Sequence, residues 1–348
     1  MRGKSMVMAM RRTYKKILCA LTAFLLFLTL AAGCGKKNQN EESGGGGDSS
    51  VKINIAALKG PTGIGMVKLR DQVQKKTAKG NYEIKFVGTP DEITGDLIKG
   101  DLQIAALPTN AAAVLYNKTG KIQLAALNTL GVLYILEKGE TIQTVSDLDG
   151  RTIYATGQGA TPEYVLDYIL KANHVTADVS YEKGSEHAEL VAQALAGQAD
   201  VVMLPEPFVT TLLSKSGEYR IALNLTEAFE QACAGQDKAG TVLTMGCIVV
   251  NKEFAQQHPE AVNQFLDAYK ASAEYAAANL DETAELTAQY GIMASAEAAK
   301  RAIPNCNIVY IDGTEMKDKI GGFFGVLYDY NAGSIGGRIP DENFYYGR

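Results

Sequence analysis

The pattern of apolar and polar positions divides the chain into an apolar leader, a polar stretch and a long folded part. Ile17 to Ala32 form a continuous apolar run, and residues 35–50 contain four consecutive glycines but no large apolar side chain. From Val51 onward, short apolar strands alternate with helical patterns, as is typical of α/β proteins. The pattern therefore predicts that the folded part begins near Val51.

The first half of the folded part shows a regular series of strands and helices. We expect strands at 51–58, 82–87, 102–107, 122–127 and 131–137, and helices at 64–76, 91–98 and 111–116. Glycine and proline residues separate these elements. Such an alternation predicts a parallel sheet with right-handed crossovers.

A second, similar series follows, and the last third of the chain is mostly helical. We expect helices at 144–148, 161–172, 185–196 and 208–215, and strands at 151–155, 179–182, 200–204, 219–225 and 244–251. Helices are then expected over 254–290, with a break near 280–283, and at 295–303 and 316–327. Residues 328–348, rich in Tyr and Gly, are expected to be irregular.

Two such series predict two Rossmann-like α/β lobes joined by two hinge crossings, with a helical C-terminal third. The crossings are expected near 128–136 and 243–250. Lobe one then comprises 51–130 and 247–348, and lobe two comprises 131–246. Two hinge strands of this kind allow one lobe to close on the other.

The leader has the features of a lipoprotein signal peptide at residues 1–33. A basic segment precedes the apolar run, which is too short to cross a bilayer, and small residues precede Cys34. We expect Cys34 to carry lipid and 34–50 to be a flexible tether. An ordinary signal peptide followed by a chance cysteine is the alternative.

The charge of the chain excludes some partners. The leader contributes six basic residues and no acid, so the rest has 28 Lys and Arg against 39 Asp and Glu, a formal charge of −11. An acidic chain without basic clusters is a poor nucleic-acid binder. The five cysteines lack C-x-x-C spacing and there are only three histidines, so we expect no metal, cofactor or catalytic residue. A disulfide between two late cysteines stays open.

Candidate binding residues follow from the expected sheets. Ligands of open parallel sheets bind at the carboxyl ends of strands, where glycines and helix starts offer backbone N–H groups. We therefore expect one cleft between the lobes, lined by Lys59, Gly60, Thr62, Thr109, Asn110, Asn128, Gln158, Gly159, Thr161, Glu206, Phe208 and Gly246. Tyr164 and Phe208 could stack on a flat ligand. For any single residue, ordinary turn chemistry is the alternative.

Other apparent motifs carry no function. Pro162 stands where a dinucleotide fingerprint beginning at Gly157 would need its third glycine. Cys247 is expected to be a small buried hydrophobe. His187, beside Glu186 and Glu189, is expected on a solvated helix face.

These residues resemble a known family. The segments LKGPTGIG (58–65), IYATGQGATPEYVL (153–166) and ADVVMLPEPFVT (199–210) resemble the substrate-binding lipoproteins of ABC importers in the nitrate/taurine/aliphatic-sulfonate group. The resemblance runs from about Val51 to the C-terminus. It implies the type II periplasmic-binding-protein fold, an extracytoplasmic lipid-anchored location and a permease partner, and we expect a monomeric receptor. Because the chain has an export signal and no histidine in the candidate loops, we expect no enzymatic activity.

The candidate loops themselves favour one class of ligand. They contain no arginine, Lys59 is their only cation, and an unpaired Glu206 carboxylate would repel an anion. We therefore expect an amine or a nitrogen heterocycle rather than a sulfonate or nitrate. Glu206 could instead turn away to cap a helix, and an anion would then be allowed. A sensor for a membrane partner, or an enzyme of the same fold in pyrimidine or quinone-precursor synthesis, are the alternative functions.

Overall fold

The computed structural model describes residues 51–181, 187–236 and 238–348. The expected leader, the tether and Cys34 lie outside the described residues. Met1–Gly46 and Gly47–Arg348 are separate units, so all the strands and helices below belong to one compact unit. None of the described helices combines the length and the apolar character needed to span a bilayer.

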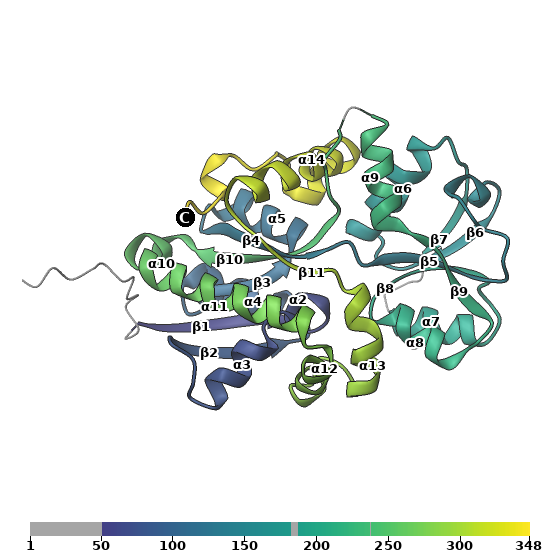
Figure 1. Cartoon of the computed structure of the whole chain (residues 1–348). Helices are drawn as coiled ribbons and strands as arrows, with labels where there is room; N and C mark the ends of the chain where they lie inside the picture. The colour runs from purple at the N-terminus through teal and green to yellow at the C-terminus, as the bar shows by residue number, and fades with distance from the viewer. Residues whose placement is uncertain (1–50, 182–186, 237) are drawn as a thin grey trace, which may run out of the picture. The chain divides into compact units, whose positions relative to one another are not determined.

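Eleven strands are found in the described part of the chain, and they form two sheets (Figure 1). The six-stranded sheet has the order β11-β4-β10-β3-β1-β2, and the five-stranded sheet has the order β7-β6-β8-β5-β9. The strands are β1 (Lys52–Leu58), β2 (Asn81–Val87), β3 (Ile104–Pro108), β4 (Ile122–Leu130), β5 (Leu133–Lys138), β6 (Thr152–Ala155), β7 (Asp178–Tyr181), β8 (Val201–Pro205), β9 (Tyr219–Asn224), β10 (Thr244–Asn251) and β11 (Ile308–Ile311).

Helices connect the strands and fill the last third of the described chain. They are α2 (Pro61–Ile64), α3 (Val67–Gln74), α4 (Asp91–Lys99), α5 (Thr109–Thr119), α6 (Thr161–Ala172), α7 (His187–Leu195), α8 (Phe208–Lys215), α9 (Leu225–Ala234), α10 (Lys252–Gln257), α11 (Pro259–Ala278), α12 (Leu280–Gln289), α13 (Ala296–Ala302) and α14 (Gly313–Asn331). Short 3-10 turns are η1 (Val145–Leu148), η2 (Ile303–Asn305), η3 (Ala332–Ile335) and η4 (Glu342–Phe344).

The expectation of purely parallel sheets is wrong. β1, β2 and β3 are parallel, but β10 runs antiparallel to β3 and β4, and β11 runs antiparallel to β4. In the other sheet β5 runs antiparallel to β8 and β9. The physical reason is that the chain crosses between the sheets at this point. β5 and β10 each come from the other sheet and begin at the edge where the parallel strands end, so they run in the opposite direction.

Several element boundaries also differ from the sequence expectation. The helix expected at 64–76 is α3, which covers only 67–74, and the short α2 ends before it at Ile64. Gly65 lies between them, where an added Cβ would be 2.7 Å from the Tyr269 hydroxyl. The break in the long helix falls at Asn279, which ends α11. Sequence reasoning missed α9 and β11. The tail is not wholly irregular, since α14 continues to Asn331.

Alternating residues of each strand enter different hydrophobic clusters. Ala56 and Leu58 of β1 belong to the cluster that contains α5 and α14, whereas Ile53 and Ile55 belong to the one that contains α3 and α11. This two-residue period places helices on both faces of the six-stranded sheet.

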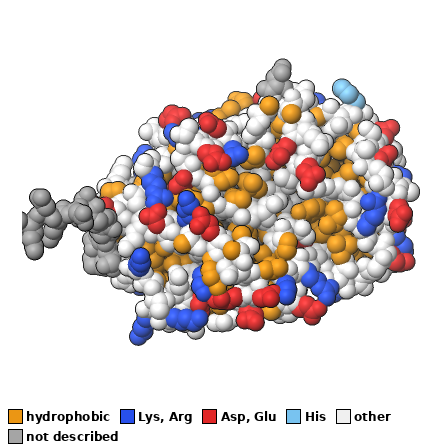
Figure 2. Space-filling view, viewed as in Figure 1, with side chains coloured by type: hydrophobic (Ala, Val, Ile, Leu, Met, Phe, Trp, Pro, Cys, Tyr) orange, Lys and Arg blue, Asp and Glu red, His pale blue; other side chains and the backbone are white. Residues whose placement is uncertain are grey.

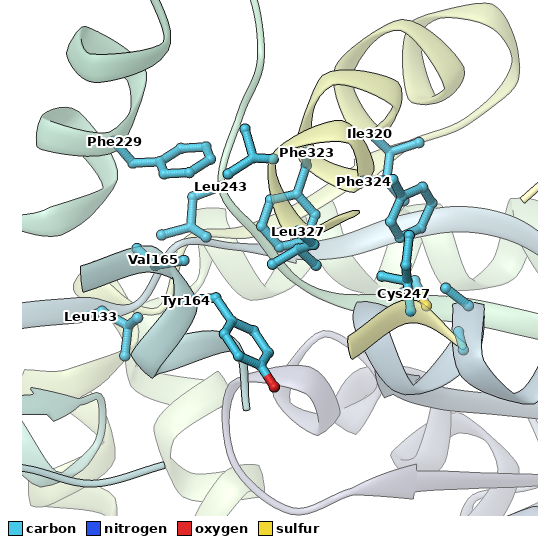
Figure 3. Packing of buried hydrophobic residues seen from close by; sticks show 14 of the residues in the cluster. Leu133, Tyr164, Val165, Phe229, Leu243, Cys247, Ile320, Phe323, Phe324 and Leu327 are labelled. Atoms are coloured by element: carbon cyan, nitrogen blue, oxygen red, sulfur yellow. The ribbon is translucent and has the colours of Figure 1, made fainter. Parts of the chain in front are cut away.

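One cluster joins elements of both sheets (Figure 3). Leu133 at the start of β5, Val165 of α6 and Phe229 of α9 pack in the same cluster as Phe323 of α14. The rings of Phe229 and Phe323 have centroids 6.1 Å apart. Burying these side chains contributes about 1.5–3 kcal/mol each, so the two sheets are held by a shared apolar core as well as by the chain crossings.

Candidate functional site

The carboxyl ends of the parallel strands of both sheets meet where β4 passes into β5. In the six-stranded sheet these ends are Leu58, Pro108 and Leu130, with the first residues of β10 beside them. Only Gly131 and Val132 separate β4 from β5, and the Glu206 N–H at the end of β8 donates to the Val132 carbonyl at 2.9 Å. The loops that the strand-end rule selects thus lie on adjoining edges.

Three of the expected site residues form one tight cluster at the first crossing. The Asn128 Nδ2 donates to the carbonyl of Thr62 at 3.0 Å, and Asn128 Oδ1 accepts from the Thr129 hydroxyl at 3.1 Å. A Cβ at Gly246 would lie 2.5 Å from Asn128 Oδ1. Asn128 is only 1% exposed. Its amide therefore fastens α2 to β4. Gly246 is small because three side chains crowd it.

The other expected residues of this sheet have different environments. Thr109 is buried at the start of α5, and its hydroxyl lies 3.0 Å from that of Thr244. Asn110 is half-buried. Lys59 is exposed, and Gly60 has φ 99°, a conformation that disfavours side chains. Lys59 and Gly60 thus form a strand-end turn, while the hydroxyl of Thr109 is directed toward β10.

Beside the five-stranded sheet, a carboxylate from the first turn of α6 binds a backbone N–H of the loop that precedes this helix. The Gly159 N–H donates to Glu163 Oε2. The Tyr164 hydroxyl donates to the Gly159 carbonyl at 2.8 Å and accepts from Asn331 Nδ2 at 3.4 Å, which brings the loop against the end of α14. Gln158 is exposed and Thr161 is buried. Glu163 therefore takes the place at the helix start where an anion would bind.

Glu206 is not an unpaired carboxylate in a cleft, as the sequence favoured, but caps a helix, which was the alternative. Its carboxylate accepts from the Thr210 N–H at 3.2 Å and the Thr210 hydroxyl at 3.0 Å, in the first turn of α8. Asn305 Nδ2 donates to it at 3.2 Å from η2. It is 2% exposed, and burial raises its pKa while the bonds from Thr210 and Asn305 oppose that rise. Glu206 thus caps α8 and contacts the segment before β11.

The expectation that His187 lies on a solvated helix face is wrong. Its Nδ1 is 2.6 Å from the hydroxyl of Thr156, and its ring centroid is 4.9 Å from that of Phe208. The half-buried Phe208 and Thr156 both lie in loops that the strand-end rule selected. Three elements, at the ends of β6 and β8 and the start of α7, therefore bring an imidazole, a hydroxyl and a phenyl ring together.

Two more residues beside the site escaped sequence reasoning. Asn305 lies in the C-terminal third, and its carbonyl accepts from the Tyr134 hydroxyl of β5 at 3.2 Å. Desolvation, assisted by the Glu206 charge, raises the pKa of Tyr134 to about 12. The strand-end rule could not find Asn305, because η2 precedes an antiparallel edge strand that no pattern predicted.

The late cysteines form no disulfide in the structure. Cys233, Cys247 and Cys306 are all free and buried. Cys247 Sγ lies 3.6 Å from the Leu107 carbonyl, and burial raises the pKa of its thiol. Such thiols are inert. In residues 51–181, 187–236 and 238–348, no three His, Cys, Asp or Glu side chains gather as they would around a metal ion.

Comparison with known proteins gives one family match and many similar structures. A family model described as NMT1/THI5 like matches residues 122–283. No curated protein sequence matches the chain.

Similar structures extend over most of the chain. An ABC transporter protein from Parabacteroides distasonis is 27% identical, with a TM-score of 0.71, and the match covers 85% of this chain and 99% of that one. The periplasmic aliphatic sulphonate binding protein SsuA from Escherichia coli is 13% identical, with a TM-score of 0.63 over 80% of this chain and 92% of that one. The ligand-binding component of an ABC-type import system from Staphylococcus aureus, solved with zinc bound, is 14% identical. Its TM-score is 0.61, and the match covers 85% of this chain and 96% of that one.

These findings confirm two sequence-based expectations. The chain has the type II periplasmic-binding-protein fold, and it is similar to the solute-binding proteins of ABC importers.

Proposed function

We propose that this protein is the extracytoplasmic, solute-binding component of an ABC importer and delivers a small polar molecule to a permease. The observation that supports this most directly is the meeting of strand ends from two sheets where the chain crosses between them, in a fold shared with import receptors. In that arrangement, the lobes at 51–130 plus 247–348 and at 131–246 would close on the ligand, and the closed form would dock on the permease. We further propose that the receptor is monomeric.

The ligand can be identified without assuming its class. Small molecules that co-purify with the protein are released by denaturation and identified by mass spectrometry, and their binding is then measured by calorimetry. Stimulation of the partner ATPase by the loaded receptor would support import. A purified protein that binds such a molecule but stimulates no transporter would support the sensor alternative.

We propose that the ligand carries an amine or a nitrogen heterocycle. Two donors that would serve an anion in the five-stranded sheet are engaged by carboxylates: the Gly159 N–H by Glu163 and the Thr210 N–H by Glu206. With these two N–H groups engaged, an approaching anion would find neither donor free and would meet the Glu163 carboxylate, whereas a cation or an N–H donor would be attracted. The rings of His187 and Phe208 would suit a flat ligand.

Calorimetry with an aminopyrimidine and with taurine tests this ligand class. We expect the aminopyrimidine to bind and His187→Ala to weaken its binding about fivefold, since an aromatic contact of this kind is worth ~1 kcal/mol. His258→Ala is the matched control, because His258 stacks on Phe254 with a similar 5.0 Å separation in α10. Tight binding of taurine that Glu206→Gln leaves unchanged would contradict the proposal.

We propose that the protein is not an enzyme. His187 places an imidazole beside the expected loops, so the scarcity of histidines in the sequence is not by itself an argument. The proposal depends on the similarity to import receptors. The bound molecule should return chemically unchanged after prolonged incubation, and a modified product would favour the enzyme alternative.

We propose that Cys34 carries the lipid anchor. Metabolic labelling with palmitate should label the full-length chain and should be abolished by Cys34→Ser, while Cys19→Ser serves as the control within the leader. Equal labelling of both variants would show that the chain is not anchored at Cys34.

A further inference from the structure

Unpaired lysines gather at the edge of the six-stranded sheet opposite the strand ends described above. This edge, called here the basal edge, holds the starts of β1, β2, β3 and β4 and the end of β10. At the start of β1, Lys52 is paired with Glu83. Six other lysines stand beside the remaining points: Lys76, Lys79, Lys99, Lys118, Lys121 and Lys252. Within the described part of the chain, no ion pair or side-chain hydrogen bond engages their ammonium groups.

This grouping differs from the rest of the described surface, where charges are mostly paired. Nine other lysines form ion pairs with Asp or Glu: Lys52, Lys68, Lys75, Lys85, Lys138, Lys238, Lys300, Lys317 and Lys319. Figure 2 shows one face of the molecule. Lys and Arg side chains, with some Asp and Glu among them, lie toward its left end, where β1 begins in Figure 1. A local excess of cations in an acidic chain is a surface for an anionic partner.

Three of these lysines line one hollow. Lys99, Lys121 and Lys252 surround a groove of about 500 Å³ together with Gln256 and Gln257. Ammonium groups and carboxamides are donors that suit phosphate oxygens. Glu253 also lines the groove, and Asp101 follows α4, so the acids at this edge are fewer than the lysines.

The position of the edge indicates which anionic partner it meets. β1 begins at Lys52 on this edge, and the sequence from Cys34 to Val51 leads into it. Only sixteen residues, Gly35 to Ser50, separate Cys34 from Val51 in the sequence. If Cys34 is anchored as proposed, the chain that leads from the membrane enters the folded unit at the basal edge.

We propose that the basal edge is a docking surface for an anionic phospholipid bilayer. Lysines 99, 118, 121 and 252 contact the phosphates, and Lys76 and Lys79 extend the contact toward β2. Such a contact would place the receptor upright on its anchor. The inference rests on the proposed extracytoplasmic location but requires no ligand, so its test fails or succeeds independently of the transport function.

Vesicle binding of the chain from Gly35 to Arg348 tests the proposal without the lipid. This chain includes the whole compact unit Gly47–Arg348, which has its own core. We expect it to co-sediment with vesicles that contain phosphatidylglycerol but not with pure phosphatidylcholine, and to dissociate when NaCl rises from ~0.05 to ~0.2 M. The triple variant Lys99→Glu/Lys121→Glu/Lys252→Glu should bind at least about tenfold more weakly.

A matched variant changes the same charge elsewhere. Lys171→Glu/Lys215→Glu/Lys270→Glu alters three lysines that also lack ion pairs within the described residues but lie away from the basal edge. It should keep wild-type binding, and both triple variants should keep the wild-type melting temperature. Equal loss of binding in both variants, or equal binding to both kinds of vesicle, would overturn the proposal.

Discussion

At the residue scale, the polar groups at the strand ends are held mostly by one another. Asn128 joins α2 to β4, and Glu206 joins α8 to η2. Buried polar groups of this kind are costly unless every bond is made. They therefore fix the geometry of the loops, and substitutions at these positions should alter stability as well as any binding.

Gly246→Ala should destabilise the protein. The new Cβ would lie 2.5 Å from Asn128 Oδ1 and 3.0 Å from the hydroxyls of Thr62 and Thr129, so the crowded cluster must shift. We expect a loss of about 1–3 kcal/mol in the free energy of unfolding, measured by urea denaturation. Gly321→Ala in α14 is the control, because no atom lies within 4 Å of its added Cβ and the change should be neutral or stabilising.

Glu206 should make stability depend on pH. Burial raises its pKa, so the folded protein keeps this proton at pH values where the unfolded chain has lost it. Its contribution to the free energy of unfolding is therefore complete below the ordinary glutamate pKa and falls as pH rises through the raised pKa.

Urea unfolding at a series of pH values checks this sign. Glu206→Gln should remove the fall, whereas the exposed Glu274→Gln should keep the wild-type profile. A Glu206→Gln profile that falls with pH as the wild type does would show that this carboxyl is not the group responsible.

At the element scale, α14 is the helix that joins the packing of both sheets. Its residues Phe323 and Phe324 are fully buried, Phe323 faces Phe229 of α9, and Asn331 reaches Tyr164 of α6. The apolar pattern of 316–327 predicted a helix, but a pattern shows only that one face is buried and not what covers it.

Phe323→Ala should therefore be strongly destabilising. Removing a fully buried phenyl ring leaves a cavity and should cost about 3–5 kcal/mol. Tyr328→Ala, at a 41% exposed position of the same helix, should change stability by less than about 0.5 kcal/mol. Thermal unfolding of both variants measures the difference, and similar losses would contradict the packing described for α14.

At the scale of the whole molecule, η2 links the two sheets beside the crossings. Asn305 of η2 bonds to Glu206 and Tyr134. Asn307, just after η2, makes two more bonds. Its Nδ2 donates to the Gly131 carbonyl, and its own carbonyl accepts from the Leu130 N–H. These contacts lie where a hinge motion would turn, so they oppose relative movement of the sheets.

Asn305→Ala should loosen this link. Glu206 would lose a bond while staying buried, which costs about 1–3 kcal/mol. Hydrogen exchange should become faster at the amides of Leu130 and Glu206, whose bonds span the crossing. Asn279→Ala, at an exposed helix end, should leave exchange at both amides unchanged.

Much of the fold follows from the sequence alone. Strand-like and helical periods along 51–225 predicted the two α/β series, because each strand and helix must bury its own apolar face. The strand-end rule selected Thr62, because strand direction fixes which loops share an edge, and the expected crossings added Asn128 and Gly246. The structure brings these three residues together.

Tertiary structure decided what local patterns do not encode. The antiparallel entry of β5 and β10, the pairing of β11 and the contact of His187 with Thr156 and Phe208 all depend on segments distant in sequence. The sequence favoured an unpaired Glu206 that faces a cleft, and this expectation is wrong because Thr210 and Asn305 surround the buried carboxyl group. Local propensity and apolar period act within one element, whereas the partners of a buried polar group are set by how the elements pack.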